Sequence, residues 1–323
     1  MPVASKKIVA PAEIPDQILN FKEMLNGGKN AAVLLGNFAQ QHPEAARIHA
    51  AAAALGIKLG FLGEAANSVG GYIAGLPVGG NAAELLAKPR KAYLLLNAEP
   101  ELDCADPQAA LGALRGAQLV VALSAFSSQA AADYAHVMLP IAPFSETPGS
   151  FVSSEGRLQT FHAAVHPLGE ARPAWKVLRV LGTLLGVQGF EYDSCEQVRE
   201  ECLRGQDIAT RLSNEISLQQ KPIATNPPGV QRIADVPIYF ADPLVRRAPA
   251  LQKTRDARAP RAWMNSKLMA RLGVAAGQPV LVKQGQGEAR LAAALDDALP
   301  DECVRVAAAR SEEHTSELQS RHN

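Results

Sequence analysis

The sequence lacks several features that would assign it to a familiar class of protein. It carries no net charge and only 20% of its residues are charged, so we expect no basic surface of the kind that binds nucleic acid. It has no uninterrupted apolar run of about eighteen residues, the length that crosses a bilayer as a helix. The N-terminal stretch MPVASKKIVAPAEIP also lacks the apolar core of a signal peptide. Direct insertion into a membrane is therefore not expected.

Cysteine is scarce, and its spacing excludes the usual metal sites. The chain has four cysteines and no C-x-x-C pair: Cys104, Cys195, Cys202 and Cys303. An iron–sulfur cluster needs several thiolates at close spacing, so no cluster is expected in this chain. Cys195 and Cys202 would share one face of a helix, but two ligands leave a zinc site incomplete. We expect all four to be small side chains that are buried or half-buried.

Two catalytic or nucleotide-binding signatures are also missing. The turn after the first predicted strand reads Gly36-Asn37-Phe38-Ala39 instead of G-x-G-x-x-G, which disfavours NAD binding. The glycines between residues 70 and 80 have no nearby Lys or Arg, so they predict a connector and not a phosphate cradle. No G-x-S-x-G motif is present, although Ser145, Glu146 and His162 offer the residue types of a hydrolase triad.

The remaining polar candidates favour structural roles. We interpret His136, His162 and His166 as surface or hydrogen-bonded histidines. Asp296 and Asp297 follow a predicted strand without a second acidic pair to share a metal ion, so they are expected to end the strand. The sequence therefore predicts no catalytic, cofactor-binding or metal-ligating residue in this chain.

What is present is an alternation of strands and helices. Hydrophobic residues make up 47% of the 323 residues, enough for sizeable cores. Strands are predicted at 31–36, 57–62, 92–96, 119–123 and 137–141, with helices at 43–55, 82–87, 107–114 and 127–135 between them. This order predicts an α/β fold with a Rossmann-like parallel sheet and flanking helices, because each crossover lays a helix over the sheet. A hairpin is expected at 151–161.

The chain divides into six predicted regions. They are an N-terminal helix (1–30), the Rossmann-like α/β domain (31–170), a helical segment (171–217), a Pro/Arg-rich connector (218–264), an incomplete β-barrel domain (265–309) and a non-native tail (310–323). The arginines of the connector, namely Arg246, Arg247, Arg255, Arg258 and Arg261, are interpreted as a solvated basic linker or as contacts to an acidic partner surface. Residues 310–320 match the in-frame translation of a common sequencing-library adapter, so the native chain is expected to end near Ala309.

A series of short motifs resembles the molybdopterin oxidoreductases. Members of that family carry a run close to A-D-x-V-L-P, an acidic loop with Glu and Gly, and N-x-E-G-R-x-Q. The matching residues are Ala135-His136-Val137-Met138-Leu139-Pro140, Glu146, Gly149 and Ser154-Glu155-Gly156-Arg157-Leu158-Gln159. This chain has His136 where the family usually has Asp, and Ser154 near its usual Asn. The resemblance implies an α/β domain of the molybdopterin-oxidoreductase type.

One position departs from the family in a way that concerns the cofactor. In molybdopterin enzymes the turn after the corresponding strand commonly reads G-x-N-P, and the Asn helps to hold the pterin. Here the turn reads Asn97-Ala98-Glu99-Pro100. A carboxylate at Glu99 would repel the phosphates of a pterin dinucleotide unless a cation intervened. We therefore expect no cofactor in this chain.

Further motifs resemble a subfamily, the G subunits of bacterial respiratory complex I, the NADH–quinone oxidoreductase. They are Glu99–Asp103, Tyr239–Arg247 and Leu251–Thr254. The resemblance implies a C-terminal fragment of a membrane-associated complex that carries electrons from NADH toward quinone. It further implies iron–sulfur clusters upstream of residue 1, other peripheral-arm subunits as partners, a cytoplasmic location peripheral to the inner membrane, and no activity of the fragment alone. Two alternatives remain, an active formate dehydrogenase-like molybdopterin oxidoreductase and a stand-alone nucleotide-binding module.

Overall fold

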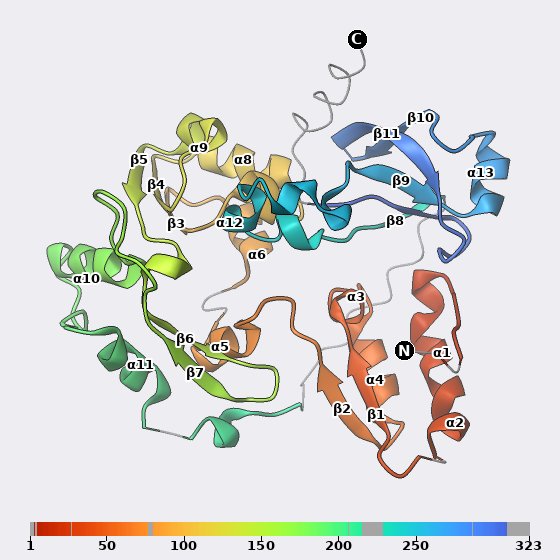
Figure 1. The fold of residues 1–323 in the computed structure, drawn as a ribbon, viewed down its shortest axis with the longest axis horizontal. Coiled ribbons are helices and arrows are strands. Elements are labelled where there is room, and N and C mark those ends of the chain that lie inside the picture. Colours follow the sequence, from red (N-terminus) through yellow and green to blue (C-terminus); the bar gives the residue numbers. More distant parts are fainter. Residues whose placement is uncertain are drawn as a thin grey trace.

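The computed structural model describes residues 3, 5–26, 28–76, 80–205, 207–214, 229–285 and 287–308. Parallel sheets with flanking helices occupy the N-terminal half, and a curled half-barrel sheet lies at the other end of the chain (Figure 1). The predicted fold class is thereby confirmed. The predicted tail at 310–323 lies outside the described residues. Within them, no helix has the length and hydropathy needed to span a membrane.

The first unit is a β-α-β crossover packed under a helical run. Its elements are η1 (Pro11–Glu13), α1 (Ile14–Ile18), η2 (Leu19–Phe21), α2 (Lys22–Asn26), β1 (Ala32–Leu35), α3 (Asn37–Gln40), α4 (Ala45–Ala53) and β2 (Lys58–Phe61). Strands β1 and β2 pair in parallel, as predicted. Ile48 and Ala52 on α4 are buried against Leu35 of β1, so apolar burial holds the helix on the sheet.

The second unit holds a separate three-stranded parallel sheet. Its elements are α5 (Ser68–Ile73), α6 (Ala82–Ala87), β3 (Ala92–Leu96), α7 (Pro100–Asp103), α8 (Pro107–Arg115), β4 (Leu119–Ser124), α9 (Gln129–Tyr134) and β5 (Val137–Pro140). The strand order is β3-β4-β5. Ser128 caps α9 by accepting a hydrogen bond from the Ala131 backbone N–H at 3.0 Å. Gly70 and Gly71, predicted to lie in a connector, are instead part of α5, where Ile73 is buried in a small core with Val152.

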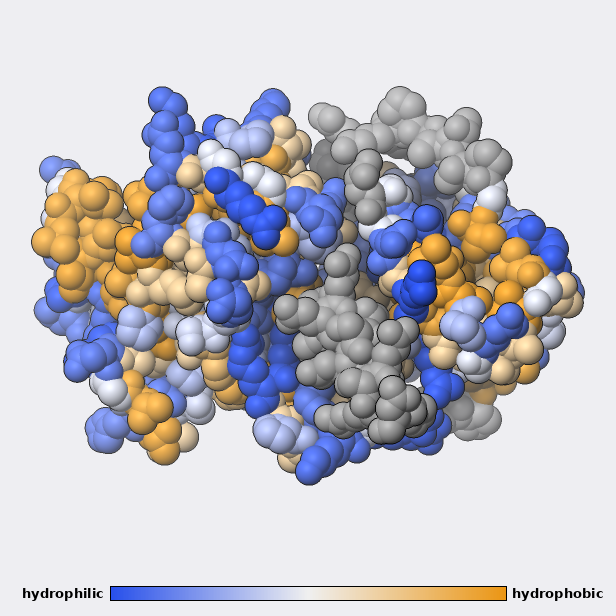
Figure 2. All heavy atoms as spheres, turned by 90° about the horizontal axis from the view of Figure 1, so that it is seen from above, coloured by the Kyte–Doolittle hydropathy of each residue, from blue (hydrophilic) through white to orange (hydrophobic). Residues whose placement is uncertain are grey.

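The helical region after the sheet presents an apolar surface. It comprises η3 (Phe144–Glu146), the antiparallel hairpin β6 (Gly149–Val152) and β7 (Leu158–Phe161), α10 (Ala174–Leu184), α11 (Cys195–Leu203) and η4 (Ile208–Arg211). The hairpin forms where the sequence predicted it. Figure 2 shows hydrophobic residues gathered at the left end of the molecule, where α10 lies. Leu184 at the end of α10 is 79% exposed, and Leu185 after it is 69% exposed.

The C-terminal sheet takes strands from the predicted connector. Its elements are β8 (Gln231–Ile233), β9 (Arg261–Met264), α13 (Ser266–Leu272), β10 (Pro279–Gln284), β11 (Gly287–Leu295) and β12 (Cys303–Arg305). The strand order is β10-β11-β9-β12-β8, so β9 is the central strand and β8 an edge strand of the sheet that was predicted to begin at residue 265. Between them lie η5 (Ile238–Phe240), α12 (Pro243–Arg246), η6 (Leu251–Lys253) and η7 (Arg255–Ala257). Residues 237–258, which hold these four elements, are here called the connector segment.

Candidate functional site

A ligand site is expected at the carboxyl end of β3, because open α/β sheets bind ligands outside the carboxyl ends of their strands. The chain turns there through Asn97, whose φ of 48° is in the left-handed region. Glu99 follows as the N-cap residue directly before α7, and it is only 4% exposed. Its backbone N–H donates to Oδ2 of Asp103 at 2.7 Å, and its carbonyl accepts from the Asp103 N–H at 2.8 Å. The turn is therefore fixed from both sides.

The Glu99 carboxylate is held by two arginines of the connector segment. Nη1 of Arg246 donates to Oε2 of Glu99 at 2.8 Å, and Nη1 of Arg247 donates to the same oxygen at 3.1 Å. Arg247 also pairs with the other carboxylate oxygen, and Arg246 also pairs with Asp103. We call Glu99, Asp103, Arg246 and Arg247 the arginine clamp. It combines two carboxylates with two guanidinium groups, so it carries no net charge when all four are ionised.

The connector segment is built to present these arginines. Asp242 begins α12 by accepting hydrogen bonds from the Leu244 and Val245 backbone N–H groups at 2.8 and 3.0 Å. Nε of Arg246 donates to the Phe240 carbonyl at 2.8 Å, which leaves its outer nitrogens for the acids. Figure 1 shows this segment between β3–β5 on one side and the sheet of β8–β12 on the other.

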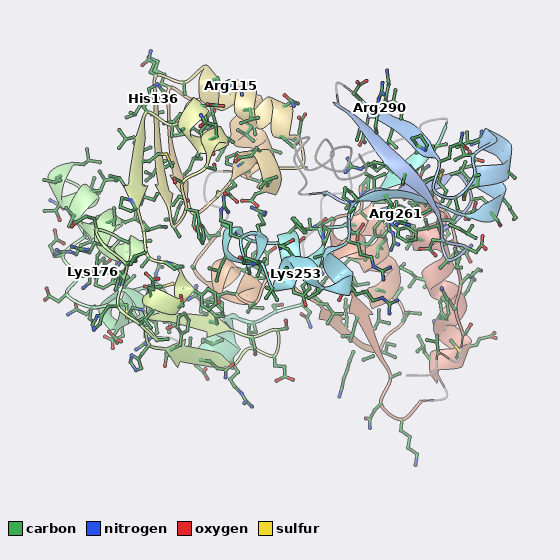
Figure 3. The ribbon with its side chains drawn as sticks, turned by 45° about the horizontal axis from the view of Figure 1, so that its top comes forward. Arg115, His136, Lys176, Lys253, Arg261 and Arg290 are labelled. Carbon is green, nitrogen blue, oxygen red and sulfur yellow. The ribbon has the colours of Figure 1, made fainter. Side chains whose placement is uncertain are left out.

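An aromatic ring completes the arrangement. The guanidinium carbon of Arg247 lies 4.7 Å from the ring centre of Phe126, which follows β4. Cation–π contacts of this length are favourable because the face of the ring is electron-rich. Arg115 and His136, in contrast, precede β4 and β5. Figure 3 shows both residues far from Lys253 of the connector segment. The cations that reach the carboxyl edge thus come from a segment distant in sequence.

The charges of the clamp are stabilised against burial. Burial alone would raise the pKa of Glu99, but hydrogen bonds and charge from Arg247 and Arg246 outweigh it and leave the pKa below its ordinary value. For Arg246, burial lowers the pKa, and its contacts to Asp103 and Glu99 outweigh that effect and raise it. All of these shifts favour the ionised pair at neutral pH.

The neighbouring carboxyl group of Glu101 behaves in the opposite way. Burial raises its pKa more than the hydrogen bond donated by the Tyr134 hydroxyl, at 3.2 Å, lowers it. Burial and the Glu101 charge in turn raise the pKa of Tyr134. The pKa values of Glu99 and Glu101 therefore shift in opposite directions, because of these two acids only Glu99 has cationic partners.

The interpretation of Arg246 and Arg247 needs correction. Arg246 and Arg247 were expected to be solvated or to face a partner, but they pair within the chain, and the Arg246 side chain is only 6% exposed. Glu99 was expected to repel phosphate groups unless a cation intervened, and here two cations do intervene. Repulsion by an isolated carboxylate is therefore not the physical reason to expect an absent cofactor.

Ser145, Glu146 and His162 do not form a hydrolase triad in the described part of the chain. Oε2 of Glu146 accepts from the Leu168 backbone N–H at 3.1 Å, and no hydrogen bond joins Ser145 to His162 in the described part of the chain. Both residues instead line an apolar hollow of about 330 Å³ with Phe144, Phe151 and Phe161. His162 and His166 are exposed, and Nδ1 of His136 accepts from the Val120 N–H at 3.0 Å, as the surface or hydrogen-bonded interpretation predicted.

The other candidates have structural roles. Oδ1 of Asp297 accepts from the Ser266 N–H at 2.8 Å, and Asp296 pairs with Arg305 at 3.2 Å, directly after β11. The four cysteines are free thiols. Among residues whose positions are described, no group of three or more His, Cys, Asp or Glu could hold a metal ion. In the family motif of the hairpin, Glu155 and Arg157 are exposed.

Comparison with known proteins identifies the class. The family model of molybdopterin oxidoreductase matches residues 18–184, just over half of the 323 residues, and this chain belongs to that family. Acetylene hydratase from Pelobacter acetylenicus shares the fold, with a TM-score of 0.50 and 18% identity over 70% of this chain and 38% of that one.

Two curated relatives are more specific. The chain is 31% identical over 140 residues to the mitochondrial NADH-ubiquinone oxidoreductase 78 kDa subunit of Neurospora crassa, which covers 39% of this chain and 18% of that protein. It is 34% identical over 73 residues, or 23% of this chain and 7% of the other, to a protein of Staphylococcus aureus named as a formate dehydrogenase. The chain thus spans less than a fifth of the length of the curated relatives described here.

The family name implies a pterin cofactor, and the residues at the carboxyl edge of β3 do not fit one. A cofactor that enters there needs side chains with free hydrogen-bonding groups directed at it. The Glu99 carboxylate instead accepts from two guanidinium groups, and the Phe126 ring covers one of them. Apolar hollows of about 300 and 330 Å³ lie away from this edge, one under α1 and one beside the hairpin.

Proposed function

We propose that this chain is part of the iron–sulfur-carrying G subunit of NADH–quinone oxidoreductase and that it supplies structure to the peripheral arm, not chemistry. In this proposal electrons pass from NADH toward quinone through clusters held elsewhere in the protein, and the other peripheral-arm subunits are its partners. The fragment itself holds no molybdenum, pterin or flavin.

The observation that carries the proposal is the arginine clamp. Open α/β folds bind ligands at the carboxyl edge, and here that edge is occupied by paired side chains of the same chain. Displacing the connector segment would leave the Glu99 carboxylate buried without its two guanidinium partners, which costs about 3–5 kcal/mol. The similarity to the 78 kDa subunit of the Neurospora crassa enzyme supports the choice of complex.

The test is the metal and pterin content of the intact protein in its complex. We expect iron, NADH–quinone reductase activity, and molybdenum and pterin far below one per chain by elemental analysis and by fluorescence of the oxidised pterin. One molybdenum and one pterin nucleotide per chain, with formate oxidation, would overturn the proposal in favour of the formate dehydrogenase-like alternative.

A variant separates a structural role from a catalytic one. Glu99→Gln should reduce the amount of assembled complex, because it weakens the clamp, while the activity per assembled complex stays unchanged. A fall in activity per complex at constant assembly would contradict the structural role.

A further inference from the structure

The amino edge of the three-stranded sheet carries a group of basic side chains. Strands β3, β4 and β5 run parallel and in register, so the residues that precede them come together at one edge. The Lys91 carbonyl, for example, accepts from the backbone N–H of Gln118 at 2.8 Å. Figure 3 shows Arg115 and His136 on the same side of this unit, at the top of the view. Five exposed residues at this edge are here called the cationic edge: Lys88, Arg90, Lys91, Arg115 and His136.

The lysines and arginines of the cationic edge are not neutralised by the chain itself. None of them takes part in an ion pair between residues that the structure describes. Two acids close to the edge along the chain, Glu84 and Asp133, instead accept from the side-chain amides of Asn81 and Gln129, at 3.4 and 3.1 Å. The whole chain has no net charge, so this edge is a local excess of positive charge.

Helix dipoles account for only part of this arrangement. Arg115 lies in the last turn of α8, and Lys88 directly follows α6, where a cation interacts favourably with the negative end of a helix. Arg90 and Lys91 lie outside any helix, between α6 and β3. The backbone N–H of Arg90 donates to the Tyr93 hydroxyl at 2.9 Å, which fixes the chain at this point. These two cations therefore need another explanation.

His136 makes the edge less acidic than the family pattern. The molybdopterin oxidoreductases usually have Asp at this position, which would add a negative charge beside the cations. Here Nδ1 of His136 accepts from the Val120 N–H at 3.0 Å, so in the neutral ring the proton is on Nε2. Lys and Arg side chains have donors and no acceptors, and the free nitrogen of His136 is then also a donor. A surface of donors alone fits a partner that offers negatively charged acceptors.

We infer that the cationic edge docks an acidic protein, whose Asp and Glu carboxylates pair with these side chains. The cations come from three strand ends, which span about 10 Å, so they do not converge on a single phosphate group. A DNA duplex presents its phosphates over a turn of about 34 Å and would extend well beyond this edge. The contact deepens the proposed function by naming the surface that a partner polypeptide uses, and it rests on that proposal only for the assembly in which the partner occurs.

Carbodiimide cross-linking of the unmodified protein in its native assembly tests the contact. The reagent joins a lysine amine to a carboxylate that touches it, with loss of water, and mass spectrometry identifies both residues. We expect Lys88 or Lys91 to be joined to Asp or Glu of another polypeptide, and Lys29, an exposed lysine outside the edge, to be joined far less often. Cross-links from Lys88 and Lys91 only to this chain, or no more often than from Lys29, would overturn the inference. Molybdenum and pterin content is measured separately, so the inference and the proposed function can fail independently.

A matched pair of double variants tests the charge. Arg90→Glu with Lys91→Glu reverses two charges of the cationic edge, and Lys29→Glu with Arg290→Glu reverses two exposed charges elsewhere, so both variants change the net charge equally. Fluorescence anisotropy with labelled polyglutamate as the probe, at low ionic strength, measures binding to the full chain. We expect the first variant to bind at least about tenfold more weakly than the parent and the control to bind within about threefold of it.

Equal weakening in the two double variants would contradict the inference, because it would show that polyglutamate responds to net charge and not to this edge. Tighter binding of a DNA duplex than of polyglutamate to the parent chain, reduced by the same two edge substitutions, would also overturn it and would assign the surface to nucleic acid.

Discussion

Replacement of Glu99 by Gln removes one charge from the arginine clamp and keeps the shape of the side chain. Arg246 would retain Asp103, whereas Arg247 would lose its ionic partner beside the Phe126 ring. Breaking a buried pair from one side costs about 3–5 kcal/mol, and we expect about 3 because Asp103 remains. For a folding unit of about 150–250 residues, a loss of about 3 kcal/mol lowers the melting temperature by roughly 6–12 °C. Circular dichroism at increasing temperature measures it.

Glu101→Gln is the control, because it makes the same substitution on the same short helix. The pKa of Glu101 is raised, so its charge costs stability in the folded state, and removing that charge should leave the melting temperature unchanged or slightly higher at pH 7. A fall as large as that of Glu99→Gln would show that any polar change in α7 is harmful and would refute the assigned role of the clamp.

The lowered pKa of Glu99 determines the pH range in which its charge stabilises the folded state. The folded pKa of Glu99 lies below its ordinary value of 4.5, so the stability it contributes is present above that value and is lost as pH falls through the folded pKa. The difference between the parent and Glu99→Gln should persist from about pH 7 to pH 5 and close only at lower pH. A difference that disappears already near pH 6 would refute this explanation.

Two further substitutions extend these tests. Phe126→Leu should cost about 1 kcal/mol through loss of the ring over Arg247, and the cost should shrink in the Glu99→Gln background; equal costs in both backgrounds, from urea unfolding, would mean that the two contacts are independent. Leu268→Ala should destabilise the half-barrel by about 2–5 kcal/mol, because this side chain is 1% exposed in its core. Trp263 fluorescence during unfolding would report it, and a change below about 1 kcal/mol would show that the core refills the space.

The local pattern of the sequence was enough for most helices and strands. The stretches at 82–87 and 92–96 occupy the predicted residues, because their caps, periodicity and apolar runs agree. Gly70 and Gly71 were assigned wrongly, since local propensity gave them no reason to be helical and only burial of Ile73 supplies it. The family motifs likewise pointed to the right fold.

The candidate site could not be predicted in the same way. Glu99 and the arginines were each noted in the sequence, but their partnership joins positions 147 and 148 residues apart. In the sequence alone, a run of charged residues indicates a solvated surface or a contact to another protein. Arg246 and Arg247 were therefore assigned to solvent or to a partner.

The sequence by itself determined the order of strands and helices, because hydrophobic period, capping residues and turn glycines act over a few neighbouring residues. Only the tertiary structure decided which side chains meet at the carboxyl edge of β3 and which cations gather at the amino edge of β3–β5. The physical reason is that ion pairing and burial depend on distances across space, which the chain sets only when all of its layers pack together.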